Sequence, residues 1–179
     1  MSITVPDTRS AMRRILLVHQ QTSGFPLGRD ALDTLEAAGA WERLQRPLDR
    51  ALGVLLEAKP EMRAPDLTVA LVLGDPEDEH FMGPCQGMTA FGGITGYITI
   101  TFWPYPENLA RLEPTAAHEL HHNLRFAPGG VVWDPATVTV GDQIVAEGLA
   151  DAYLAATGQT AAQALHAGSA EVIAATPRG

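Results

Sequence analysis

Residues 118–122 read HELHH, and this pentapeptide combines histidine and glutamate at a spacing that suits metal-dependent hydrolysis. On a helix, positions i and i+4 share one face, so the imidazoles of His118 and His122 can reach the same ion. Glu119 follows the first histidine, and its carboxylate can accept a proton from a water molecule on that ion. The pattern therefore predicts a zinc site with Glu119 as the catalytic base.

A catalytic zinc site usually has three protein ligands, so the two histidines leave one ligand to be found. The segment EGLAD supplies Glu147, 25 residues after His122 and in a second stretch with a helical pattern. Zinc accepts both imidazole nitrogen and carboxylate oxygen. We expect His118, His122 and Glu147 to bind one Zn²⁺ per chain. His121 offers an alternative, because with His118 it forms an i, i+3 pair that could also reach a metal.

Together, HELHH and the downstream EGLAD resemble the motifs of the gluzincins, the thermolysin-like class of HExxH zinc peptidases. The chain is more closely similar to a bacterial family of predicted zinc-dependent proteases that carries an HE-x-HH motif and a later EGLA motif. This resemblance covers roughly residues 66–156. It implies a zincin fold in which His118, His122 and Glu147 bind the metal and Glu119 acts as the base.

The resemblance also implies roles for residues around the ligands. In gluzincins an aspartate four residues after the ligand glutamate orients the first histidine, and Asp151 stands at that position. Thermolysin-like enzymes stabilise the oxyanion with a tyrosine and a histidine, which makes Tyr153 and His166 candidates. The alternative is that Tyr153 packs in the core and that His166 is an ordinary surface histidine.

Zincins place an edge strand before the metal helix, and such an edge can bind an extended peptide. The stretch Gly96, Tyr97 and Ile98 precedes HELHH and is a candidate for this strand. A buried central strand is the alternative interpretation of the same residues.

The pattern of the remaining chain favours an α+β fold. Apolar residues recur at helical spacing between Arg29 and Glu57, which predicts two helices. The β-rich segments 67–73 and 97–103 predict strands. The metal helix is expected to begin at Glu113-Pro114-Thr115, and the second ligand helix to begin with Asp142 as its N-cap.

We therefore expect residues 1–179 to form a single zincin-like domain. It would contain a small mixed sheet, with an edge strand above the HExxH helix and a second ligand-bearing helix beside it. Residues 1–11 and about 160–179 are expected to be loose. Members of the family continue past the EGLA helix with an aromatic- and glycine-rich portion, whereas 32 residues follow Glu147 here. A C-terminal subdomain could therefore be missing.

Composition restricts the partners that the protein is expected to bind. The net charge is −9 and no cluster of Lys or Arg is present, which argues against nucleic acid and anionic membranes. No 18-residue apolar stretch exists, so no membrane span is predicted. Cys85 is the only cysteine, which excludes an internal disulfide. A cytoplasmic location is the expectation that follows.

The leading interpretation is a zinc metallopeptidase, an endopeptidase that hydrolyses peptide bonds in peptide or protein substrates. No GxMxN aminopeptidase signature precedes HELHH, so exopeptidase action has no support in the sequence. A second interpretation is a catalytically inactive zinc-binding module, derived from a zincin fold and acting through protein interactions. A third is a metal-free domain that acts through protein contacts.

Overall fold

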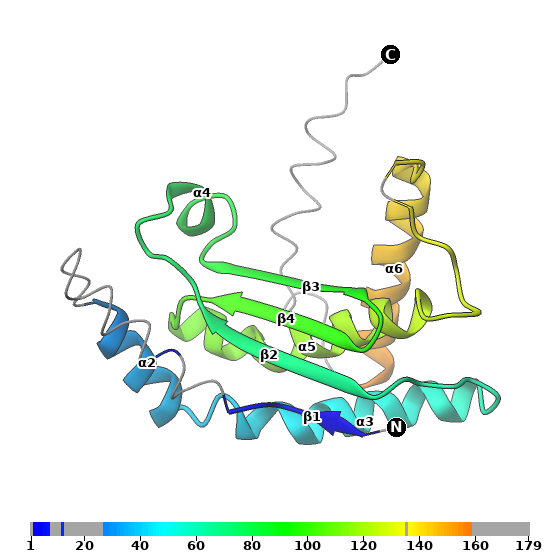
Figure 1. Ribbon diagram of the computed structural model, residues 1–179, viewed down its shortest axis with the longest axis horizontal. Helices are drawn as coiled ribbons and strands as arrows, with labels where there is room; N and C mark the ends of the chain where they lie inside the picture. Colours follow the sequence, from blue (N-terminus) through cyan, green and yellow to red (C-terminus); the bar gives the residue numbers. More distant parts are fainter. Residues whose placement is uncertain (1, 8–11, 13–26, 135, 159–179) are drawn as a thin grey trace, which may run out of the picture.

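The computed structural model describes residues 2–7, 12, 27–134 and 136–158 of the chain (Figure 1). Its strands are β1 (Ile3–Thr4), β2 (Leu67–Leu73), β3 (Met88–Ile94) and β4 (Tyr97–Phe102). Its helices are α2 (Leu27–Ala37), α3 (Glu42–Ala58), α4 (Glu79–Met82), α5 (Pro106–Arg125) and α6 (Val140–Ala156). The mixture of strands and helices in one domain confirms the α+β class.

The four strands form one mixed sheet in the order β1-β2-β4-β3. Strands β1, β2 and β4 are parallel, whereas β3 is antiparallel to β4. The prediction of a small mixed sheet is therefore confirmed. The prediction that Gly96, Tyr97 and Ile98 lie on its edge is wrong, because β4 pairs with β2 on one side and with β3 on the other. Among the described strands, β3 is the edge on this side of the sheet.

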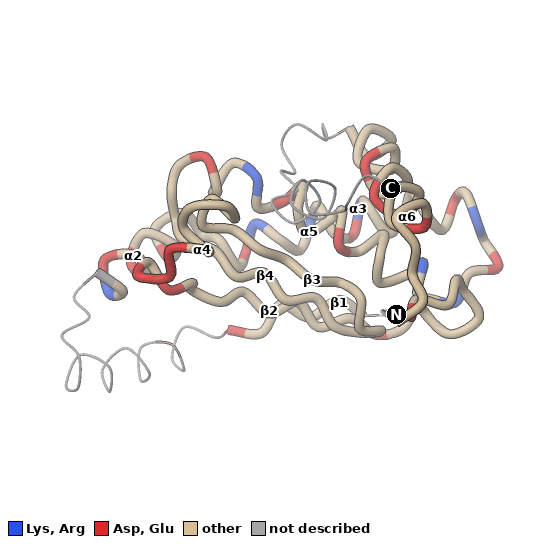
Figure 2. The backbone as a smooth tube through the Cα atoms, turned by 90° about the horizontal axis from the view of Figure 1, so that it is seen from above, with Lys and Arg blue, Asp and Glu red and all other residues tan. Residues whose placement is uncertain are grey.

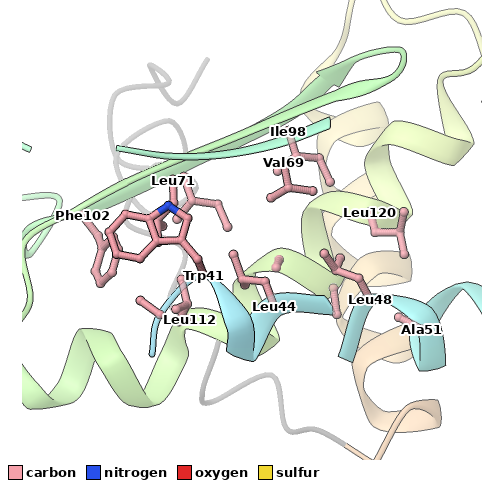
Figure 3. Close-up of a cluster of buried hydrophobic side chains, with 14 of the residues drawn as sticks. Trp41, Leu44, Leu48, Ala51, Val69, Leu71, Ile98, Phe102, Leu112 and Leu120 are labelled. Atoms are coloured by element: carbon pink, nitrogen blue, oxygen red, sulfur yellow. The ribbon is translucent and has the colours of Figure 1, made fainter. Parts of the chain in front are cut away.

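Alternation along β4 places one of its faces against the core. Ile98, Ile100 and Phe102 are fully buried, while the residues between them point to the other face. Helices α3 and α5 cover the buried face, as Figure 1 shows. Figure 3 shows the core between these layers, in which apolar side chains from the sheet meet those of α5 and of α3 with its preceding residue: Val69, Leu71, Ile98, Phe102, Leu112, Leu120, Trp41, Leu44, Leu48 and Ala51.

The N-terminal segment is partly ordered by the sheet. Ile3 and Thr4 pair with the start of β2, and the backbone N–H of Ser2 donates to Asp66 Oδ1 at 2.6 Å. The prediction that residues 1–11 are loose is therefore wrong for Ile3 and Thr4. The physical reason is that parallel pairing and partial burial of Ile3 against the core hold this segment in place. Residues 160–179, also expected to be loose, lie outside the described residues.

The two helices predicted between Arg29 and Glu57 are α2 and α3, and they are separated at Gly39, whose φ is +61°. The prediction for the start of the metal helix is wrong. Helix α5 begins at Pro106, which occupies the first turn, and Pro114 lies inside the helix. Arg43 of α3 donates to the carbonyl of Leu109 at 2.9 Å and to the carboxylate of Glu113 at 2.7 Å. These contacts hold α5 to α3 next to Pro114, which has no backbone N–H and so leaves one hydrogen bond of the helix unmade.

Charged residues are spread over the molecule. Figure 2 shows Lys and Arg on separate elements of the described chain, with no stripe of positive charge. No helix in the described ranges is both long enough and apolar enough to cross a membrane.

Candidate metal centre

Helix α5 carries the HELHH motif in its last two turns and is buried along most of its length. Ala117, Leu120 and Leu124 form an apolar stripe on one face of α5 and belong to the core. His118 and His122 lie on another face of the same helix and are nevertheless only 3% and 7% exposed. The second helix, α6, packs against this face (Figure 1).

The start of α6 fixes the position of the third expected ligand along that helix. The predicted N-cap, Asp142, is wrong: Thr139 is the N-cap and Asp142 stands at N3. The hydroxyl of Thr139 accepts from the backbone N–H of Asp142, while the Asp142 carboxylate accepts from the backbone N–H of Thr139. This reciprocal capping box satisfies two N–H groups at the helix start. Glu147 follows two turns into the helix and faces α5.

The structure brings His118, His122 and Glu147 together. The Nε2 atoms of the two histidines lie 2.9 Å apart. The Glu147 carboxylate lies 3.0 Å from Nε2 of His118 through Oε2 and 3.4 Å from Nε2 of His122 through Oε1. The three residues form a group whose candidate ligand atoms all lie within 4.8 Å of one another.

This group fits a zinc ion in both chemistry and spacing. The ligands of a tetrahedral zinc ion lie about 2.0–2.1 Å from it and therefore roughly 3.3 Å from one another. The spacings among His118, His122 and Glu147 are 2.9 to 3.4 Å. Two imidazoles and one carboxylate are also the donor set of many catalytic zinc sites. A single cation between these atoms would thus be bound by all three residues.

Asp151 lies on the far side of the first histidine. Its Oδ1 atom is 3.4 Å from Nδ1 of His118, the ring nitrogen that faces away from His122. A carboxylate at this nitrogen favours a proton there and leaves Nε2 free to bind a metal. The geometry is therefore that of a residue that orients His118.

Glu119 is buried beside the group, with 9% of its surface exposed. Burial raises the pKa of its carboxyl group above the ordinary value. This effect outweighs the lowering of the pKa by His118 and His122 and by the backbone amide of Gly92 on β3. A carboxylate that takes up a proton readily, next to a group of metal ligands, is suited to act as a base.

The candidate ligands shift one another's pKa values. Burial alone would raise the pKa of Glu147, but its contacts with His118 and His122 hold that pKa well below its usual range. For His122, burial lowers the pKa, but the carboxylates of Glu147 and Glu119 raise it further than burial lowers it. Glu147 therefore stays negatively charged, and the site attracts a cation.

His121 lies outside the ligand group. Its ring is 6.0 Å from that of His122 and 5.6 Å from that of Tyr153. Burial lowers its pKa to about 4, so the ring is neutral at pH 7. The structure thus favours the i, i+4 pair over the pair of His118 with His121.

The structure places Tyr153 in the hydrophobic core, 6% exposed. Its hydroxyl is buried with no hydrogen-bond partner among the described residues, and burial raises its pKa. This is the environment of a packing tyrosine, the alternative given by the sequence, and not of an exposed oxyanion donor. His166 lies outside the described residues.

Two aromatic residues near the second histidine were not singled out by the sequence. The ring of Phe126 stacks on that of His122, with centroids 5.7 Å apart and planes within 5°, and Trp133 packs on Phe126 at 4.8 Å. Nδ1 of His122 is buried and has no hydrogen-bond partner in the described part of the chain. His122 thus has an aromatic ring stacked against it, whereas His118 has a carboxylate beside its Nδ1 atom. The one available signal was the position of Phe126, four residues after His122 on the same helix face.

A hollow of about 180 Å³ continues from this aromatic pair towards α6. Its walls combine apolar side chains with a few charged groups. They include Arg125, Phe126, Val131, Trp133, Asp142 and Val145.

A His-His-Glu group on two packed helices, with a glutamate directly after the first histidine, defines an HExxH-type zinc site in an α+β domain. The chain belongs to the family described as "Predicted Zn-dependent protease (DUF2268)", which it matches over residues 50–173. The match contains both ligand helices and the whole of β2, β3 and β4.

One curated relative is an uncharacterized Bacillus subtilis protein, YjfC. It is 30% identical to this chain over 126 residues, which are 70% of this chain and 40% of YjfC. The chain therefore spans about two fifths of the length of that relative. No solved structure matches the chain.

Proposed function

We propose that this protein is a zinc-dependent endopeptidase that hydrolyses bonds within peptide or protein chains. The observation that carries the proposal is the convergence of His118, His122 and Glu147 on one point, with the carboxylate of Glu119 beside them. Family membership supports a protease, and the geometry supports a site that binds one zinc ion per chain.

The ligands and their neighbours divide the work of holding the ion. His118, His122 and Glu147 would bind it, Asp151 would keep the ring of His118 in the correct orientation, and Phe126 would do the same for His122. Zinc, when bound, lowers the pKa of a coordinated water to about 7 and polarises a substrate carbonyl.

Glu119 performs the proton transfers in this proposal. It accepts a proton from the attacking water as the water oxygen bonds to the carbonyl carbon of the substrate. It then gives that proton to the amide nitrogen as the carbon–nitrogen bond breaks, which releases a carboxylate and an amine. Because burial raises the pKa of Glu119, the group can hold the proton between the two steps.

Strand β3 is the candidate for binding the peptide backbone. It pairs with β4 on one side and, among the described strands, has no partner on the other. An extended peptide could add to such an edge through backbone hydrogen bonds. Phe91 and Ile94 on this strand are 54% and 59% exposed and offer apolar contacts to substrate side chains. The substrate-binding role first expected for Gly96, Tyr97 and Ile98 is thus proposed for β3.

The decisive experiment compares wild type with Glu119→Gln. Both purified proteins are loaded with zinc, their zinc content is measured, and cleavage of casein and of a fluorogenic peptide panel is followed. The amide keeps the shape of the side chain but cannot accept the proton, so cleavage should fall by about 10²-fold or more at equal zinc content. Glu107→Gln, the same change in the exposed first turn of α5, is the control and should cleave like wild type.

Two outcomes would contradict the proposal. Near wild-type cleavage by Glu119→Gln would remove Glu119 from the chemistry. A zinc-loaded wild type that cleaves no substrate would instead favour the zinc-binding module that acts through protein interactions.

A further inference from the structure

Two buried asparagines of α5 tie the β3–β4 hairpin to this helix, one at each end of the hairpin. Asn108 and Asn123 are each 1% exposed. They are 15 residues apart on the same helix, which corresponds to about 22 Å along its axis. Asn123 lies one turn after Glu119, whereas Asn108 lies near the other end of the helix.

Asn108 binds the end of the hairpin that is distant from the HELHH motif. Its Nδ2 atom lies within 2.9 to 3.1 Å of the backbone carbonyls of Gln86, Gly87 and Trp103. These residues precede β3 and follow β4. The contact therefore anchors the two outer ends of the strand pair.

Asn123 makes the corresponding contacts at the turn of the hairpin. Its Nδ2 atom lies 2.9, 2.6 and 2.9 Å from the backbone carbonyls of Gly92, Ile94 and Tyr97. Its Oδ1 atom accepts from the backbone N–H of Gly96 at 3.1 Å. One side chain thus contacts four backbone groups around a single turn, with its two N–H groups directed at three carbonyls.

These bonds occur where the β3–β4 ladder is irregular. The register shifts between Phe91 and Ile94, and the ladder pairs neither Gly92 nor Gly93 with a residue of β4. The carbonyls of Gly92 and Ile94 bond to Asn123 instead. A bulge bends an edge strand locally, and the bonds to Asn123 hold β3 in this bent conformation.

The backbone at this bulge is the part of β3 that contacts Glu119. A Cβ atom at position 92 would overlap the carbonyl oxygen of Glu119 and would lie 3.0 Å from its Oε2 atom. Glycine is therefore required for strand and helix to come this close. The backbone N–H of Gly92 also donates a hydrogen bond to the Glu119 carboxylate.

We infer that Asn123 is a positioning residue for Glu119: it holds the bulge of β3 on α5 so that Gly92 fixes the Glu119 carboxylate beside the ligand group. This inference rests on the proposed function, because it assigns Asn123 a role in the reaction that Glu119 performs. The side chain of Asn123 bonds backbone groups of the hairpin, so its effect on Glu119 passes through the strand.

The test compares Asn123→Ala with Asn108→Ala in zinc-loaded protein. Each change leaves buried carbonyls of the same hairpin without a donor, so both variants should lose stability to a similar extent. Displacing a catalytic group by about 1 Å can cost about 10²-fold in rate. We expect Asn123→Ala to lower kcat by that order, with zinc affinity close to wild type. Asn108→Ala should keep the wild-type kcat.

Gly92→Ala provides a second variant with Asn123 intact. Its added methyl group pushes β3 away from Glu119, so kcat should fall as it does in Asn123→Ala. Equal kcat values for Asn123→Ala and Asn108→Ala would overturn the inference, because two asparagines that only stabilise the hairpin would have the same effect on kcat. A wild-type kcat in Gly92→Ala would overturn it as well.

A structural measurement separates this inference from the proposed function. If zinc-loaded wild type cleaves nothing, the proposed function fails, and crystal structures of the two asparagine variants then decide the inference. A Glu119 carboxylate displaced in Asn123→Ala but not in Asn108→Ala supports it. An unmoved carboxylate in both variants overturns it.

Discussion

Glu119 and Asp151 are carboxylates on neighbouring helices with different surroundings. Glu119 is buried and its pKa is raised, which suits proton transfer. The side chain of Asp151 is 33% exposed and lies 3.4 Å from Nδ1 of His118. In the proposed site Asp151 faces a ligand, and we propose that it orients the ring of His118. We therefore expect changes at Glu119 to affect the chemistry and changes at Asp151 to affect the affinity for metal.

Asp151→Ala should weaken zinc binding by about 10- to 100-fold while the domain stays folded, which is the usual range for a group that orients a ligand. Competition with a chelating dye measures the affinity, and circular dichroism checks the fold. Asp49→Ala, which removes an exposed carboxylate from α3, is the control and should bind zinc like wild type. An affinity unchanged in Asp151→Ala would show that this residue does not support His118.

The elements that carry the site were predictable to different degrees. The imidazoles of an i, i+4 pair reach one ion when the pair lies on a helix, so HELHH predicted a helix. Glu147 then required a second helix beside it. Strand β3 was missed, because Gly92 and Gly93 do not favour a strand. The glycines are there because α5 approaches too closely for a side chain at position 92. That reason comes from tertiary packing and is not visible along the chain.

Helix α6 offers a test of how its start supports Glu147. Thr139→Ala removes the hydroxyl that accepts from the backbone N–H of Asp142 and should lower the free energy of unfolding by about 1 kcal/mol. Urea unfolding monitored by circular dichroism gives this value. Thr137→Ala, at an exposed position just before the helix, should change it much less. Equal effects of the two changes would show that the capping box does not stabilise α6.

Gly148 lies inside α6, next to Glu147. A Cβ atom at this position would meet nothing within 4 Å. Gly148→Ala should therefore raise the free energy of unfolding by about 0.5–1 kcal/mol, because alanine favours the helix and fits without strain. The same urea titration measures the change. A lower stability than that of wild type would mean that the glycine is required by packing.

At the scale of the whole molecule, the sheet and helices hold residues from distant parts of the chain around one point. The sheet supports α5 from one side, α3 from another, and α6 closes the group with Glu147. The sequence indicated the ligands because their chemistry restricts the residue types. It did not indicate Asn123 or Gly92, because asparagine and glycine carry no such chemistry and act only through the contacts that the fold creates.

The central claim is that His118, His122 and Glu147 bind one zinc ion, and the metal content of purified variants tests it most directly. We predict about one zinc per chain in wild type and in Glu119→Gln. His118→Ala and Glu147→Ala should lose most of the metal, since two remaining protein ligands hold zinc poorly. Elemental analysis after dialysis gives the stoichiometry. Full zinc occupancy in Glu147→Ala, or none in wild type supplied with zinc, would contradict the account.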